Sequence, residues 1–457
     1  MTQQRKLLLR ILFPSLLIVL IGYLSIAFYY HTHFFSGSFI NNIDYSGKTV
    51  KEIESNIADE MSTYTLTIEG RNELTDTISA SDIKFHYVSE GQVQTLKDQQ
   101  NEFLWPFSFF TQQQSQMQVR CEYNESLLIK CRDNLVFFKD NITTKPLNAE
   151  ILYGDDGFYI HPETLGTTLN KETVLSALKD AIKACASSLS LENASCYISP
   201  SVLSSDESIQ TALDVLRKYT DLTITYDFGD RTEVLDRSLL KDWVRIDENF
   251  QVTLDKQKVI DYVNFLGYYY TTFSSTRDFV RYDGKAIQVK GGDYGWIINR
   301  TEEVEQLYQL ILDGKSMTRE PVYSQFALSR DKNDIGNTYI EINLKKQHLW
   351  LFVDGKKIMD SKVVTGNISK DYATPSGIYA ITYKERNATL VGQNYNSPVN
   401  YWMPFNKNIG FHDASWRDKF GGKIYKKKGS HGCVNMPPKK AKKLYESIQK
   451  GTPVVIY

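Results

Sequence analysis

The decisive stretch of this chain runs from Gly410-Phe-His412-Asp413, through a spacer rich in Gly and Lys, to Ser430-His-Gly-Cys433-Val-Asn435. Seventeen residues separate His412 from Ser430, and Cys433 is the only cysteine after Cys196. A thiol becomes a good nucleophile when a nearby base or dipole favours the thiolate, and His412 and His431 are available as bases. The stretch therefore predicts a Cys/His acyl-transfer site.

The turn before Cys433 has its own chemistry. Gly432 permits a tight turn in which the backbone N–H groups of Gly432 and Cys433 face one spot, as an oxyanion formed on a carbonyl requires. Ser430 and Asn435 are expected to fix this turn by bonds from side chain to backbone. Zinc binding is the alternative, but structural zinc sites need four ligands and usually a second cysteine. We therefore expect no metal and no organic cofactor.

The signature formed by His412, the spacer and Ser430-His-Gly-Cys-Val-Asn435 resembles that of L,D-transpeptidases with a YkuD-type catalytic domain. That signature has a distant His, a spacer of about this length, Ser or Thr, then His-Gly-Cys, a hydrophobic residue and Asn. All fixed positions are present, and the resemblance covers residues 337–457. It implies a strand-rich domain with one helix.

The resemblance also assigns roles to the residues that match. It implies Cys433 as the nucleophile that forms a thioester and His412 as the proton donor and acceptor. It implies that His431 shapes the pocket beside the sulfur. The carboxylate of Asp413 could hold the tautomer of His412, although the family uses a backbone carbonyl at this place.

Aromatic residues precede the signature. Tyr401 and Trp402 are candidates for an aromatic wall that binds substrate, and ordinary core packing is the alternative reading.

The implied activity is that of a membrane-anchored L,D-transpeptidase acting on peptidoglycan stem peptides. Such an enzyme passes the acyl group of a donor tetrapeptide to a neighbouring stem and makes a 3→3 crosslink. Hydrolysis, as in an L,D-carboxypeptidase, and exchange of the D-amino acid use the same thioester. A wall-binding protein without activity is the alternative from another class.

Composition limits the number of domains and the kinds of partner expected for the chain as a whole. Its 457 residues, 42% of them hydrophobic, allow two to four domains. The 29 tyrosines favour β-rich structure. The formal net charge of −1 argues against a nucleic-acid partner, because such proteins rely on a positive field.

A membrane segment is predicted at the N-terminus. Residues 1–10 form a basic tail, and residues 11–30 contain no charge over a length that spans a bilayer. The positive-inside rule puts the tail in the cytoplasm and the catalytic domain outside the cell membrane, facing the wall. A signal peptide cleaved after Ser25-Ile-Ala27 is the alternative.

Four cysteines fall into two close pairs in the exported part. Their spacing predicts small-loop disulfides Cys121–Cys131 and Cys185–Cys196, with Cys433 as a free thiol. Four reduced cysteines are the alternative.

The chain between the membrane segment and the signature has two similar halves, residues 31–198 and 199–316, followed by a linker at 317–336. Each half combines strands with an amphipathic helix, after Asn170 in the first and Asn299 in the second, which predicts two α+β domains. They resemble the peptidoglycan-binding domain often found ahead of YkuD domains, and a plain spacer is the alternative. Beyond residue 337, alternating strands predict a β-sandwich.

Overall fold

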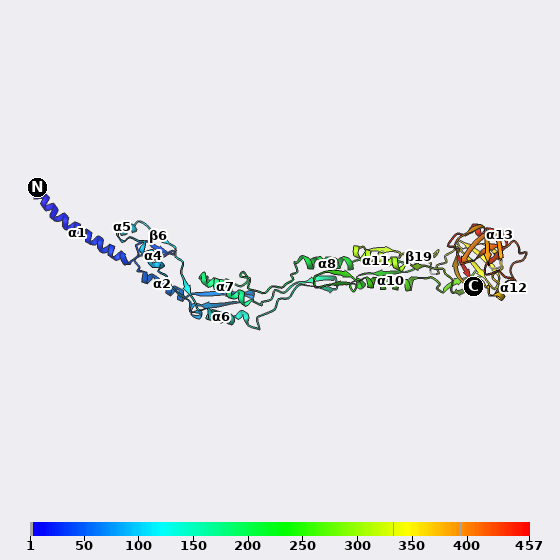
Figure 1. The fold of residues 1–457 in the computed structure, drawn as a ribbon, viewed down its shortest axis with the longest axis horizontal. Helices are drawn as coiled ribbons and strands as arrows, with labels where there is room; N and C mark the ends of the chain where they lie inside the picture. Colours follow the sequence, from blue (N-terminus) through cyan, green and yellow to red (C-terminus); the bar gives the residue numbers. More distant parts are fainter. Residues whose placement is uncertain (1–2, 332, 393–394) are drawn as a thin grey trace. The chain divides into compact units, whose positions relative to one another are not determined.

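The computed structural model describes residues 3–331, 333–392 and 395–457 (Figure 1). The chain folds into two compact units. One comprises Met1–Glu150 with His161–Ser204, and the other comprises Ile151–Ile160 with Ser205–Tyr457. The division after Ser204 lies a few residues beyond the boundary expected from the sequence.

A long helix, α1 (Gln3–Thr32), opens the first unit. Its segment Ile11–Thr32 has a mean hydropathy of 2.4, and it is the only helix in the described part of the chain that is long and apolar enough to cross a membrane. The side chains from Ile11 to Ile21 are exposed, whereas Ala27 and Tyr30 near the end of α1 are buried against the domain that follows.

An α+β domain follows α1. Its elements include, in order, α2 (Val50–Ser62), β3 (Thr65–Glu69), β4 (Thr75–Ser79), α3 (Ala80–Ile83), β5 (His86–Tyr87), β7 (Cys121–Glu122), α6 (Glu125–Asn134), α7 (Lys171–Lys183) and β10 (Ser188–Ser190). The hairpin of β8 (Glu150–Gly154) and β9 (Gly157–His161), which lies between α6 and α7 in the chain, belongs mostly to the second unit. Asn170 caps α7 as predicted, accepting a bond from Thr173 N at 3.0 Å. Its apolar face, Val174, Leu178 and Ile182, is fully buried.

The second unit begins with a domain built in the same order. Its elements are α8 (Glu207–Thr220), β11 (Ile224–Asp227), β12 (Thr232–Leu235), α9 (Arg237–Leu240), β13 (Val244–Ile246), β14 (Val252–Leu254), α10 (Lys256–Tyr270), β15 (Arg277–Val280), β16 (Ala286–Val289), α11 (Arg300–Asp313) and β18 (Met317–Arg319). The sheets β10-β3-β4 and β12-β11-β18 both join an antiparallel hairpin to a parallel strand that follows a helix. These two three-stranded sheets thus share one topology.

The domains differ between two corresponding strands. In the second domain β13 and β14 are joined by residues 247–251. In the first, the equivalent pair β5 and β7 is joined by residues 88–120. This insertion contains α4 (Gln92–Asp98), the 3-10 turn η2 (Glu102–Leu104), α5 (Trp105–Ser108) and β6 (Gln113–Ser115).

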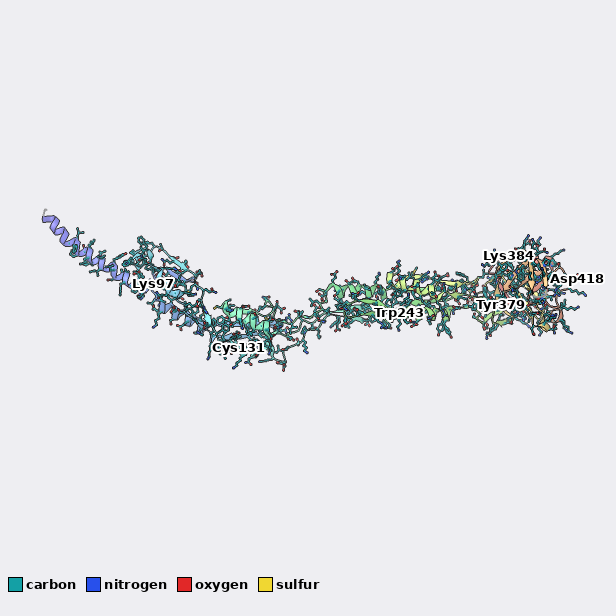
Figure 2. The ribbon with its side chains drawn as sticks, viewed as in Figure 1. Lys97, Cys131, Trp243, Tyr379, Lys384 and Asp418 are labelled. Carbon is teal, nitrogen blue, oxygen red and sulfur yellow. The ribbon has the colours of Figure 1, made fainter. Side chains whose placement is uncertain are left out.

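The predicted disulfide pairs are wrong. All five cysteines are free thiols. Burial raises the pKa of Cys121 to about 12, and its neighbour is Cys185, two residues after the end of α7, not Cys131. Cys131 lies on α6 (Figure 2), where its thiol faces the Asp82 carbonyl at 4.0 Å. Pairing by sequence proximity failed because the strand β7 and the end of α7 meet in space although they are far apart in the chain.

The C-terminal domain is β-rich, as predicted. One sheet has the order β22-β21-β20-β28-β23 and the other the order β24-β25-β26-β27. Their strands are β20 (Tyr339–Asn343), β21 (His348–Val353), β22 (Lys356–Lys362), β23 (Gly377–Ala380), β24 (Glu385–Gly392), β25 (Tyr395–Asn406), β26 (Ile409–Asp413), β27 (Val434–Met436) and β28 (Pro453–Ile456). One apolar core joins both sheets with helix α13 (Pro438–Ser447), and it includes Leu351, Phe405, Phe411 and Leu444.

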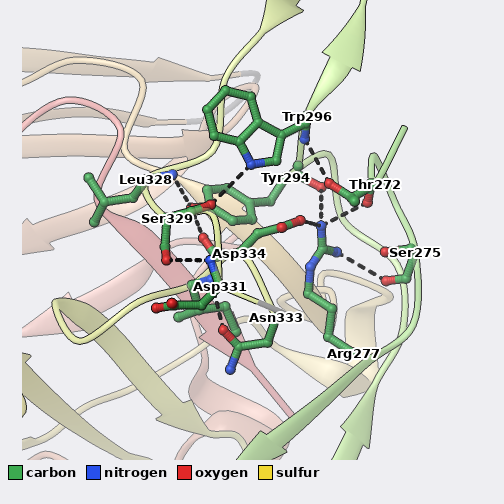
Figure 3. A network of polar contacts seen from close by, with 12 residues as sticks. Thr272, Ser275, Arg277, Tyr294, Trp296, Leu328, Ser329, Asp331, Asn333 and Asp334 are labelled. Carbon is green, nitrogen blue, oxygen red and sulfur yellow. Dashed lines mark hydrogen bonds and ion pairs between the residues drawn. The ribbon is translucent and has the colours of Figure 1, made fainter. Parts of the chain in front are cut away.

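A buried ion pair fastens the second α+β domain to the segment that leads into the C-terminal domain (Figure 3). Arg277 and Asp334 are bonded at 2.8 Å, with side chains 3% and 8% exposed. The same guanidinium donates to the carbonyls of Thr272 and Ser275. The Asp334 carbonyl accepts from Tyr294 Oη at 2.8 Å. The buried polar groups at this joint thus have hydrogen-bond partners, except Arg277 Nε.

Candidate active site

Three adjacent strands carry the candidate site. The register pairs Trp402 on β25 with His412 on β26, and His412 with Asn435 on β27. Residues two apart on a strand share a face, so Cys433, directly before β27, lies on the face of Asn435. Phe411 and Val434 take the other face and are fully buried in the core. The alternation therefore places His412, Cys433 and Asn435 on one side.

The turn before Cys433 is held by two features. Gly432 has φ +120°, a backbone conformation that favours glycine. Ser430 Oγ donates to the Cys433 carbonyl and accepts from Gly432 N. Because the Gly432 N–H is directed to Ser430, its expected place in an oxyanion hole is wrong for this conformation. The Cys433 N–H is the remaining candidate.

The Cys433 thiol is buried and neutral at rest. Its Sγ lies 3.5 Å from the Asn408 carbonyl, an acceptor to which an S–H group can donate. Burial raises the pKa of Cys433 to about 11. A thiolate is therefore not the resting form near neutral pH.

The His412 ring is buried and its proton position follows from its neighbours. Nδ1 lies 2.8 Å from the Asp413 backbone carbonyl, which can only accept, so Nδ1 carries the proton. Nε2 lies 2.8 Å from the Asn435 amide nitrogen, which donates to it. Burial lowers the pKa of His412, with the Asp413 carbonyl opposing this effect. The resting imidazole is thus neutral.

Arg417 determines which way the Asn435 amide faces. Its Nε donates to Asn435 Oδ1 at 2.9 Å, and a guanidinium cannot accept, so the amide nitrogen must face His412. Arg417 also donates to the Lys428 carbonyl at 3.0 Å, which ties it to the spacer. Burial lowers the pKa of Arg417, a residue that stays charged at any ordinary pH.

A cavity of about 200 Å³ opens over these groups. His412, Cys433 and Asn435 line it together with Arg417 and Ser430; the other lining residues are Leu390, Ser397, Trp416, Gly429 and His431. The half-exposed Trp416 ring lies over His412 at 5.8 Å between centroids. His431 is exposed at the cavity, with its ring 4.7 Å from that of Tyr372.

The other predicted site residues lie as follows. Trp402 is buried and packs with Cys433, whereas Tyr401 points to the opposite face and packs on Tyr445 of α13. Adjacent residues on a strand face opposite sides of the sheet, so Tyr401 and Trp402 cannot form one aromatic wall. The prediction is therefore wrong for Tyr401. The Asp413 carboxylate accepts from the backbone N–H groups of Asn400 and Tyr401 on β25, and the hydrogen bond to His412 comes from the Asp413 backbone carbonyl.

Sequence reasoning missed Arg417 and Trp416 and misassigned Asn435. Asn435 bonds to two side chains rather than to backbone. Arg417 lies inside the spacer, where its only sequence signal is that a cation follows His412 by five positions. In the described part of the chain, no group of three or more His, Cys, Asp and Glu side chains could hold a metal ion.

The family model of the YkuD-type L,D-transpeptidase catalytic domain matches residues 337–456. The C-terminal domain belongs to the YkuD family. The YciB protein of Bacillus subtilis is 29% identical over 129 residues, covering 26% of this chain and 66% of that relative. The chain thus matches slightly less than two thirds of the curated relative.

Solved YkuD structures are also similar to this chain. A cysteine-to-serine mutant of the Enterococcus faecium L,D-transpeptidase is 34% identical, over 55% of this chain and 100% of that chain, with a TM-score of 0.48. The catalytic domain of the E. faecium enzyme is 42% identical, over 26% of this chain and 97% of that chain, with a TM-score of 0.25.

Proposed function

We propose that this protein is a membrane-anchored L,D-transpeptidase that makes 3→3 crosslinks in peptidoglycan. The observation that carries the proposal is the meeting of Cys433 and His412 in one cavity, from neighbouring strands of a YkuD domain. The donor is a stem tetrapeptide, cut between the L-centred diamino acid at position 3 and the D-residue at position 4.

The first half-reaction forms a thioester. Cys433 Sγ loses its proton to His412 Nε2 as the sulfur attacks the donor carbonyl, which requires the Asn435 amide to leave Nε2 first. Nδ1–H keeps its bond to the Asp413 carbonyl and stabilises the imidazolium. In this proposal the Cys433 N–H stabilises the oxyanion. The leaving amine of the D-residue takes the proton from His412 as its bond breaks.

The second half-reaction reverses these roles. An amine of a neighbouring stem gives its proton to His412 and attacks the thioester carbonyl, and the Cys433 sulfur leaves and recovers a proton. Water or a free D-amino acid in place of this amine gives hydrolysis or exchange.

Membrane anchoring is supported by the packing of α1. Ala27 and Tyr30 are buried in the first α+β domain, although they flank the place at which a signal peptide would be cut. Cleavage there would remove part of that packing. A retained anchor agrees better with this packing, and the basic residues 1–10 favour a cytoplasmic N-terminus. Binding of peptidoglycan by either α+β domain stays a prediction.

Purified tetrapeptide muropeptides test the function directly. Incubation with the full chain in detergent should give 3→3 dimers by mass spectrometry. Cys433→Ala should give none, because it removes the only thiol in the cavity. His412→Ala should lose about 10²–10⁴-fold, the usual contribution of acid–base help. Dimers formed by Cys433→Ala would refute the mechanism, and monomeric tripeptide alone would identify a carboxypeptidase.

A further inference from the structure

The insertion in the first α+β domain carries an exposed apolar surface. Five large apolar residues within eight positions are exposed: Phe103 by 50%, Leu104 by 52%, Phe107 by 67%, Phe109 by 59% and Phe110 by 87%. Soluble surfaces rarely expose contiguous apolar patches of this kind unless they bind something. The second domain has only residues 247–251 at the equivalent place. The shared α+β fold therefore does not require this surface.

The same segment is attached to α1. Tyr23 Oη donates to the Phe103 carbonyl, and the Trp105 ring lies 5.8 Å from Tyr23 and 6.4 Å from Tyr30. The only charged residue of the segment, Glu102, pairs with His31 at 3.3 Å. The segment thus runs beside the last turns of the apolar helix, with its one charge at the end of that helix.

The depth of this segment in a bilayer follows from the geometry of α1. At 1.5 Å per residue, Tyr23 lies about 13 Å along the axis from Thr32. The apolar span Ile11–Thr32 measures about 33 Å, close to the ~30 Å hydrocarbon core. With Thr32 at the outer boundary, the part of α1 from Tyr23 to Thr32 would cross the outer half of a bilayer, and Tyr30 would lie near the boundary where aromatic side chains are favoured.

We propose that residues 102–110 are a second membrane contact, an aromatic wedge that enters the outer leaflet beside α1. The wedge has lipid as its partner. It would hold the first α+β domain against the membrane surface instead of leaving it free on a single helix. The proposal rests on α1 being the retained anchor of the proposed function.

Photocrosslinking to lipid tests the wedge in the full chain. The protein is placed in nanodiscs containing a phospholipid with a diazirine high on its acyl chain, and adducts are mapped by mass spectrometry. Adducts are expected on α1 and on residues 102–110. Phe107→Ser with Phe110→Ser should lower the yield on the segment several-fold and leave α1 unchanged. Tyr268 and Tyr269, 77% and 60% exposed in the second domain, are the matched control and should carry no adduct.

The outcomes separate the two proposals. Adducts on α1 without any on residues 102–110 would overturn the wedge and leave the anchor intact. No adducts on α1 would overturn the anchor. Equal labelling of Tyr268 and Tyr269 would indicate nonspecific adsorption of lipid and would overturn the wedge. Crosslinks from residues 102–110 to a second copy of the chain instead of lipid would also overturn it.

Discussion

Arg417 sets the tautomer of His412 through a third side chain. The guanidinium accepts nothing, so Asn435 must turn its oxygen to Arg417 and its nitrogen to His412 Nε2. The imidazole is then left with its proton on Nδ1, the form that can take a proton from Cys433 at Nε2. Arg417 is therefore a positioning residue in the proposed mechanism.

Arg417→Met should change the pH profile more than the fold. Without Arg417 the Asn435 amide can turn its oxygen to Nε2, which favours a protonated ring and raises the pKa of His412. The acid limb of crosslinking should therefore move to higher pH, so that the loss of rate is larger at pH 5 than at pH 8. The measurement is the rate of dimer formation between pH 5 and 9.

Two variants control this prediction. Arg417→Lys keeps a donor and should restore part of the wild-type profile. Lys423→Met removes an exposed cation from the same spacer and should change nothing. An equal loss for Arg417→Met at every pH would indicate a merely structural role.

Alkylation of Cys433 should be slow near neutral pH. Its pKa is raised to about 11, so the thiolate fraction grows about tenfold per pH unit up to that value. The rate of iodoacetamide labelling, followed in the Cys433 peptide, should still be rising at pH 10, where a free cysteine with a pKa of about 8.5 has levelled off. A plateau near pH 8 would contradict a neutral resting thiol.

The number of free cysteines can be counted by alkylation. Protein that is unfolded without reductant should take up five alkyl groups. Uptake of one or three groups would mean that disulfides form in the chain. Comparison with a reduced sample controls for incomplete labelling.

Breaking the Arg277–Asp334 pair should destabilise the joint before the C-terminal domain. Both side chains are buried, and loss of one partner leaves the other charge uncompensated, at a cost of about 3–5 kcal/mol. Arg277→Met should lower the midpoint of urea unfolding of the second unit accordingly. Exposed Arg245→Met, whose pair with Asp255 lies on the surface, should cost less than about 1 kcal/mol.

Local pattern predicted much of the C-terminal domain. Alternation beyond residue 337 predicted strands, and β20, β21 and β22 lie there, while the helix that the resemblance implied corresponds to α13. The contacts that turn a motif into a site were not visible, because they depend on register. The order of residues along the chain does not show that Asn435 lies opposite His412 or that Arg417 bonds to Asn435. The cysteine pairing failed for the same reason.

The buried thiol of Cys433 has a consequence for its chemical lifetime. Peroxides and other oxidants attack the thiolate far faster than the thiol. With a pKa of about 11, Cys433 offers them almost none at neutral pH. Oxidation of a cysteine to the sulfinic acid is not reversed by thiol reductants, so keeping the sulfur protonated until a donor arrives preserves the nucleophile. Because the resting thiol reacts slowly, covalent inhibitors that first bind the protein tightly should react with Cys433 in preference to small electrophiles that do not bind.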